Sequence, residues 1–197
     1  WDIGFIRPPL EIIGRHRKFE INALNERGKR ILPMIQKAIE GQDYIESMNV
    51  GPESITGELV PMPDYFPEEE RSKQPGLFSM LRSIRSFFGS DQDPYIGFFG
   101  SFGYDLVFQF EPIELKHERP YNYADAHLFL PDQLFIVDHR KENAEVRNYD
   151  FHMGTHNTQG LDRAGKHFPL PERQSKEIES DNHPGEYAEK VGKLIEG

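Results

Sequence analysis

The sequence predicts an α+β fold in which antiparallel strands are joined as hairpins and helices lie beside them. Strand-like runs follow one another across short turns, as in 10–13 and 19–24, instead of alternating with long helices. Apolar residues recur at helical spacing in only a few separate segments. With 37% hydrophobic and 12% aromatic residues, the 197-residue chain can build a packed core.

Strand patterns recur throughout the first 150 positions. They are short runs rich in β-branched and aromatic residues, bounded by turn residues such as Gly51 and Pro52. In chain order the predicted strands are 10–13, 19–24, 44–50, 54–60, 95–102, 128–130, 133–138 and 144–149. We expect 95–102 to be buried, and 104–110 fits either a short helix or a further strand.

Helices are expected where apolar residues recur every three or four positions. The first covers 31–39 and follows a turn signal at 25–28. The second covers 77–88, and Gly89 follows it in the position of a helix C-cap. The third begins at Pro184, since proline is favoured in the first helical turn.

The pattern predicts one domain and the start of another. A length of about 150 residues per domain allows one domain or slightly more. Residues 1–150 form the predicted domain, 151–180 have the polar, Gly- and Pro-containing composition of a linker, and 181–197 hold the last helix. Both ends fall within predicted elements, so we expect the sequence to be part of a longer protein.

Composition excludes several classes of protein. The chain has 23 Lys and Arg against 33 Asp and Glu, a net charge of −10, whereas nucleic-acid modules carry a basic surplus on one face. It has no Cys for a disulfide scaffold or a thiolate metal site. No apolar run approaches the roughly 18 residues of a membrane helix, and no signal peptide opens the sequence. These features predict a cytoplasmic protein that binds neither nucleic acid nor membranes.

A local excess of positive charge occurs at Arg15, His16, Arg17 and Lys18. These residues lie between two predicted strands, so the simplest interpretation is a solvated hairpin turn. Four potential cations flanked by acidic residues also make a weak anion-binding site.

The segment 95–110 combines regularly spaced glycines with aromatic residues, which are seven of its sixteen positions. It lacks the patterns of a phosphate-binding loop, and it has no Lys or Arg for nucleic-acid stacking. Glycines between large rings predict close backbone packing. We therefore expect a Cβ at Gly100 or Gly103 to collide with neighbours, and Phe99 or Phe102 to be largely buried. The predicted structural motif consists of Gly97, Gly100, Phe102, Gly103, Tyr104 and Asp105.

No catalytic or metal-binding residue is predicted. His152 and His156 are four positions apart, but Gly154 and its neighbours do not favour a helix there. The chain has no Cys nucleophile, no Ser in a G-x-S-x-G elbow, and no carboxylates whose spacing forces them into one pocket.

Two motifs carry a resemblance to a known family. FFGSFGYDLV at 98–107 and FLPDQLFIVDH at 129–139 resemble the N-terminal region of anthranilate synthase component I. Segments 19–28 and 184–191 are similar as well, so the resemblance extends along the whole chain. The sequence YDLVFQFEP at 104–112 is most similar to the bacterial type fused to a glutamine amidotransferase.

The resemblance implies a fold of antiparallel sheets packed face to face with flanking helices. It also implies a lyase of tryptophan biosynthesis that converts chorismate and glutamine-derived ammonia to anthranilate and pyruvate, with Mg²⁺ as cofactor and tryptophan as feedback inhibitor. In that family the chorismate and Mg²⁺ ligands follow the helix at Tyr187, and a tryptophan-binding Leu-Glu-Ser motif would precede Trp1. The chain is therefore expected to be an inactive scaffold or regulatory portion, with no metal bound and its effector residues unassigned.

The expected partners are a C-terminal chorismate-binding domain, whose first helix lies in 181–197, and a glutamine amidotransferase domain or subunit. Two alternatives stay open. One is aminodeoxychorismate synthase component I, which has the same architecture, and the other is a regulatory or interaction domain without catalysis.

Overall fold

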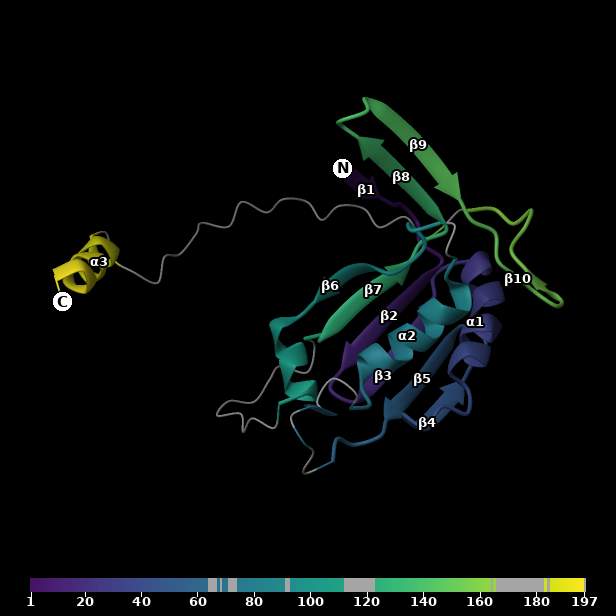
Figure 1. Cartoon of the computed structure of the whole chain (residues 1–197), viewed down its shortest axis with the longest axis horizontal. Helices are drawn as coiled ribbons and strands as arrows, with labels where there is room; N and C mark the ends of the chain where they lie inside the picture. Colours follow the sequence, from purple (N-terminus) through teal and green to yellow (C-terminus); the bar gives the residue numbers. More distant parts are fainter. Residues whose placement is uncertain are drawn as a thin grey trace. The chain divides into compact units, whose positions relative to one another are not determined.

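A computed structural model describes residues 1–63, 67, 69–70, 74–90, 93–111, 123–163, 165, 183 and 185–196 (Figure 1). It divides into two compact units, Trp1–His167 and Phe168–Gly197, of which the second contains helix α3 (Glu186–Glu196). In the first unit, antiparallel sheets are flanked by helices. The predicted α+β class is thus confirmed.

The larger sheet has six strands in the order β4-β5-β3-β2-β7-β6, and every neighbouring pair is antiparallel. The strands are β2 (Leu10–Arg15), β3 (Lys18–Ala23), β4 (Ile45–Val50), β5 (Ser54–Leu59), β6 (Phe99–Phe102) and β7 (Ala126–Leu130). The two central strands β2 and β3 form the predicted hairpin, and their turn contains the basic cluster.

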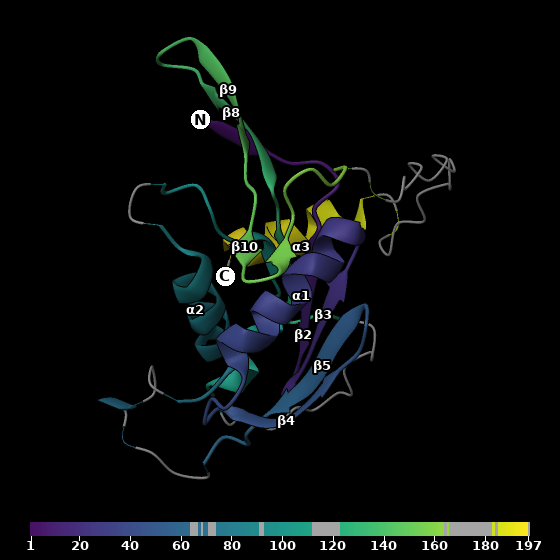
Figure 2. The same ribbon diagram turned by 90° about the vertical axis from the view of Figure 1, so that its right-hand side faces the viewer.

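The core lies between one face of this sheet and two helices, α1 (Glu26–Ile39) and α2 (Leu77–Phe88), which contact each other (Figures 1 and 2). Alternate residues of β2, such as Leu10 and Ile12, are fully buried because successive side chains of a strand point to opposite faces. The helices contribute their apolar stripes, including Ile35 and Ile84.

Helix α1 begins with a side-chain cap. The Oδ1 atom of Asn25 accepts a hydrogen bond of 3.0 Å from the backbone N of Gly28. A Cβ at Gly28 would overlap the carbonyl oxygen of Pro9, which itself accepts a hydrogen bond of 2.8 Å from the backbone N of Leu24. The first turn of the helix therefore requires both the cap and the glycine.

Asn25→Ala should lower the free energy of unfolding by about 1 kcal/mol, because the cap is lost and a helical N–H is left unpaired. Urea unfolding of the chain measures this change. Asn25→Ser, which retains a capping oxygen, should recover most of the loss, and Asn49→Ala on the exposed strand β4 is the control. An equal loss in the Ser and Ala variants would contradict a capping role.

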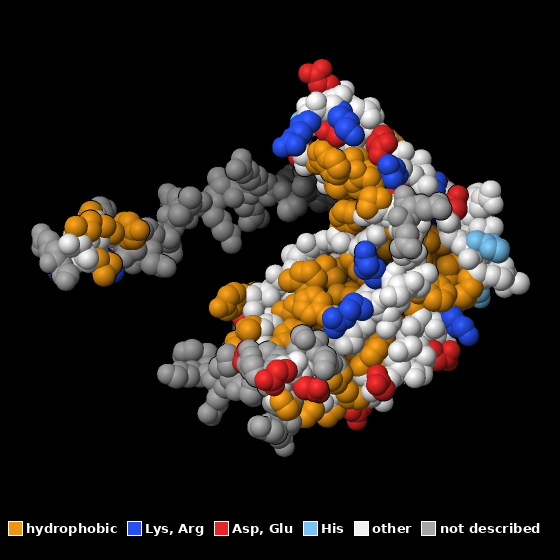
Figure 3. Space-filling model, viewed as in Figure 1, with side chains coloured by type: hydrophobic (Ala, Val, Ile, Leu, Met, Phe, Trp, Pro, Cys, Tyr) orange, Lys and Arg blue, Asp and Glu red, His pale blue; other side chains and the backbone are white. Residues whose placement is uncertain are grey.

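A smaller sheet continues from the larger one. Strand β8 (Gln133–Asp138) follows β7 after Pro131 and Asp132, and it pairs with β1 (Asp2–Gly4) and β9 (Asn143–Asn148). Phe135 and Val146 lie opposite each other and are 37% and 52% exposed. Figure 3 shows hydrophobic side chains at the surface in this region. One face of the small sheet is thus partly uncovered.

One expectation about the elements needs correction. The run 95–102 forms only the four-residue strand β6, an edge strand that pairs with β7 alone. It is not a buried strand, because just one neighbour covers it and the residues before Phe99 leave the sheet. The segment 104–110 resolves as a 3-10 helix, η2 (Tyr104–Gln109).

The start of the predicted linker belongs to the first unit instead. Residues 151–163 include the hairpin of β10 (His152–Met153) and β11 (His156–Asn157), and Phe151 and Thr158 are buried. Backbone carbonyl oxygens of this segment, those of Thr158 and Leu161, accept hydrogen bonds from the buried Arg27. Most of 164–182, and the predicted helix start at Pro184, lie outside the described residues.

Candidate functional site

The glycines of the predicted structural motif lie where β6 approaches its neighbours. A Cβ at Gly100 would overlap the carbonyl oxygen of His127 and lie 2.8 Å from the Cα of Leu128. A Cβ at Gly103 would lie 2.9 Å from the carbonyl oxygen of Ala124. A Cβ at Gly97 would have no neighbouring atom within 4 Å. Two of the three glycines therefore allow close backbone contact, as a packing role requires.

The other residues of this motif are more exposed than expected. Phe102 is 50% exposed, with its ring centroid 5.4 Å from that of Phe78, and Tyr104 is 91% exposed. Phe99 is partly buried, and Asp105 is partly buried in the first turn of η2. Phe102 is not buried because β6 lies at the edge of the sheet, and the cavity that Gly97 lines has a volume of only about 10 Å³.

A charged cluster that the sequence did not predict is centred on Arg27, whose side chain is completely buried. Its guanidinium links the start of α1 to the β7–β8 corner and to the chain after β9. It donates from Nε to Asp132 Oδ2, from Nη1 to the carbonyl oxygens of Thr158 (2.6 Å) and Leu161 (3.2 Å), and from Nη2 to Tyr149 O and Asp150 Oδ1 (both 2.8 Å).

The charges of this cluster are balanced internally. Asp132 is 2% exposed, and the hydrogen bond from Arg27 lowers the pKa of Asp150. Arg163 adds a second guanidinium 3.4 Å from the same Asp150 oxygen. Because every nitrogen of the Arg27 guanidinium has an acceptor, the cluster has a structural role and offers no free group for chemistry.

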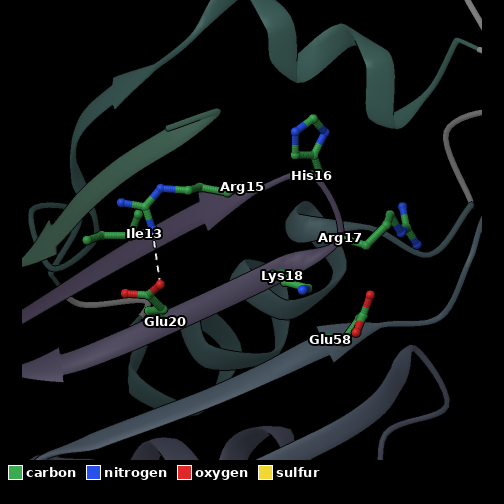
Figure 4. Close-up of a pocket in the computed structure, with 7 residues that line it drawn as sticks. All are labelled: Ile13, Arg15, His16, Arg17, Lys18, Glu20 and Glu58. Atoms are coloured by element: carbon green, nitrogen blue, oxygen red, sulfur yellow. Dashed lines mark hydrogen bonds and ion pairs between the residues drawn. The ribbon is translucent and has the colours of Figure 1, made fainter. Parts of the chain in front are cut away.

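The basic turn between β2 and β3 forms part of a pocket. The cavity has a volume of about 220 Å³ and is shown in Figure 4. We call it the turn pocket, and its lining residues are Ile13, Arg15, His16, Arg17, Lys18, Glu20 and Glu58. The sequence indicated the basic cluster, but not the contribution of Glu58, which comes from β5 through strand pairing with Lys18.

Hydrogen bonds fix the backbone of this turn. His16 has a φ of +53°, its backbone N donates to Asp125 Oδ2 at 2.5 Å, and its carbonyl oxygen accepts from Gln109 Nε2 at 2.7 Å. Arg17 donates from Nη2 to the carbonyl oxygens of Val60 and Pro75. The turn is therefore held from several sides and is not a free, solvated loop.

The guanidinium groups of the turn pocket keep unused donors. Arg15 Nη1 pairs with Glu20 Oε1 at 3.1 Å, but its Nε is buried without a hydrogen-bond partner. Nε and Nη1 of Arg17 are likewise buried and unpartnered. Burial also lowers the pKa of Arg17, although the group remains a cation. An unpaired buried donor is unfavourable, so these atoms favour an acceptor.

Two histidines each pair with one carboxylate. His127 Nε2 lies 3.0 Å from Glu11 Oε2, and His139 Nε2 lies 2.7 Å from Asp2 Oδ2. Within the described residues, no group of three or more His, Asp or Glu side chains could hold a metal ion. The helices in that part of the chain are also too short or too polar to cross a membrane.

Comparisons with known proteins identify relatives of a single kind. No protein-family model matches the chain. It is 36% identical over 185 residues to anthranilate synthase of Azospirillum brasilense. The aligned region covers 94% of this chain and 25% of that protein. It is 32% identical over 131 residues to anthranilate synthase component 1 of Vibrio parahaemolyticus, and this alignment covers 64% of the chain and 23% of that protein. Anthranilate synthase component 1 of Buchnera aphidicola subsp. Tetraneura caerulescens is 29% identical over 123 residues, which are 61% of the chain and 23% of that protein. The chain spans about a quarter of the length of these relatives.

Proposed function

Because this chain is a homologue of the anthranilate synthases and resembles their component I, we propose that it is the N-terminal scaffold portion of such an enzyme. The longer protein would act in tryptophan biosynthesis in the cytoplasm, forming anthranilate and pyruvate from chorismate and glutamine-derived ammonia. The observation that carries the proposal is the 36% identity over 94% of the chain. The resemblance supports glutamine amidotransferase and a chorismate-binding domain as partners, and tryptophan as inhibitor.

In this proposal the chain has a structural role in the longer enzyme. Two of the segments that carry the resemblance include residues with packing roles. Arg27 and Gly28 lie in the first turn of α1, and Gly100 and Gly103 allow close backbone contact at β6. A cavity of about 430 Å³ is lined by Tyr149, Asp150 and His152 beside apolar residues, but Asp150 is already paired with the buried arginine cluster. The family's Mg²⁺ finds no fitting ligand set within the described residues, so we assign it no ligand and no step here.

Production of anthranilate tests the proposal. The 197-residue chain and the longer encoded protein are each incubated with chorismate, Mg²⁺ and either ammonium or glutamine, while anthranilate fluorescence and pyruvate are followed. We expect the longer protein to form both products and the chain alone to form neither.

Each contrary outcome has a separate meaning. Anthranilate formed by the chain alone would contradict its scaffold role. Aminodeoxychorismate without pyruvate, or no product, from the longer protein would overturn the proposed reaction and favour the related synthase or a non-catalytic domain.

A further inference from the structure

The turn pocket concentrates positive charge in a chain whose net charge is −10. Three strong bases line it, and the carboxylates do not neutralise them all. Glu20 pairs with Arg15, whereas Arg17 and Lys18 have no carboxylate partner among the described residues. Glu58 is the remaining acidic group of the lining, so the pocket keeps a net positive charge.

The donors of the pocket are also held in place before any ligand binds. The two carbonyl oxygens that accept from Arg17 fix its guanidinium, while Nε and Nη1 remain without partners. The pairing with Glu20 positions Arg15, and its Nε is unpartnered in the same way. Buried donors on charged groups form strong hydrogen bonds with anionic oxygens. Both guanidinium groups therefore lie beside the cavity with hydrogen-bonding capacity that the protein does not use.

The size of the pocket limits the ligand. At about 220 Å³ it is smaller than the roughly 300–1,000 Å³ typical of sites for larger organic ligands. It still exceeds the roughly 30 Å³ share of one water molecule several times. A single phosphate or carboxylate group fits within this volume, with Ile13 as the apolar part of the wall.

We propose that the turn pocket binds a small oxyanion, a phosphate or a carboxylate group, through Arg15, Arg17 and Lys18. Glu58 lies directly across from Lys18 in the strand pairing, and its negative charge weakens the site. We therefore expect a dissociation constant of the order of 1 mM for inorganic phosphate. This site is independent of the proposed synthase activity.

NMR titration of the 197-residue chain tests the proposal. Amide chemical shifts are followed as inorganic phosphate is added at constant ionic strength, and a second titration uses acetate. We expect saturable shifts confined to the β2–β3 turn and its neighbours. Saturation by phosphate, by acetate or by both supports the site and identifies the group it prefers. Shifts that stay linear or spread over the surface with both anions would overturn it.

Three exposed-site variants separate specific from general electrostatic binding. Lys18→Gln should weaken binding about fivefold, the effect of one unit charge about 4 Å away in water. Glu58→Gln should strengthen it by a similar factor, since a repulsive charge is removed. Lys37→Gln on the exposed side of α1 makes the same charge change away from the pocket and should leave the affinity unchanged. Equal effects of Lys18→Gln and Lys37→Gln would contradict a defined site.

Discussion

We expect Arg27→Met to lower the free energy of unfolding by about 3–5 kcal/mol, the usual cost of removing one partner from a buried ion pair. Asp132, 2% exposed, would keep only the more distant guanidinium of Arg163, whose Nε lies 3.8 Å from its Oδ2, and the carbonyl oxygens of Thr158 and Leu161 would lose their donor. For a protein of this size the loss corresponds to roughly 6–20 °C in melting temperature. A domain has only about 5–15 kcal/mol of stability, so soluble yield should fall as well.

The control for this variant lies one turn further along the same helix. Arg30 is exposed and has no ion pair among the described residues, so Arg30→Met should change stability by less than about 0.5 kcal/mol. Arg27→Lys keeps the charge but not the planar arrangement of five donors, and it should remain destabilised. Similar melting temperatures for Arg27→Met and Arg30→Met would contradict the role given to the cluster.

A second variant keeps the test informative if Arg27→Met does not fold. Asp132→Asn removes the buried negative charge while retaining the shape and an acceptor oxygen. Combined with Arg27→Met, it should cost less than the two single changes added together, because neither member is then left as an isolated buried charge. Simple additivity would show that the two groups do not depend on each other.

The pattern of the larger sheet and its helices could be predicted because periodicity reports which face is buried. The hairpin of β2 and β3 and the helix α2 follow directly from such spacing. The pattern could not show that β6 lies at an edge, since aromatic residues such as Phe102 occur both in buried strands and along exposed edges. Strand order depends on long-range pairing, which local composition does not report.

The polar segment after Tyr149 illustrates a second limit. Its composition is that of a linker, yet Thr158 is fully buried. The backbone oxygen of Thr158 and the carboxylate of Asp150 both accept hydrogen bonds from Arg27. The partners are separated by more than a hundred positions in sequence. A buried arginine in the first turn of a helix gives no local signal, and only the three-dimensional structure brings its acceptors together. The turn pocket is similar, since Glu58 joins it through strand pairing alone.

Gly100→Ala should lower the free energy of unfolding by about 1–3 kcal/mol or more, the cost of forcing extra volume into a packed site. The added Cβ would overlap the carbonyl oxygen of His127, and backbone atoms of a paired strand cannot turn aside as a side chain can. The φ of +156° at this position is also one that residues other than glycine rarely adopt. Thermal unfolding measures the loss, and amide hydrogen exchange should show that β6 and β7 lose protection first.

Gly97→Ala is the matched control, because it adds the same methyl group three residues earlier, where nothing lies within 4 Å. Its effect should stay within about 0.5 kcal/mol. Phe102→Ala should cost less than the roughly 3–5 kcal/mol of a fully buried phenylalanine, since half of its surface is already exposed. In the longer protein, Gly100→Ala should reduce soluble yield much more than the activity of the folded molecules. If it melted like the parent protein and lost chorismate turnover instead, the segment would belong to an active site and the packing role would be wrong.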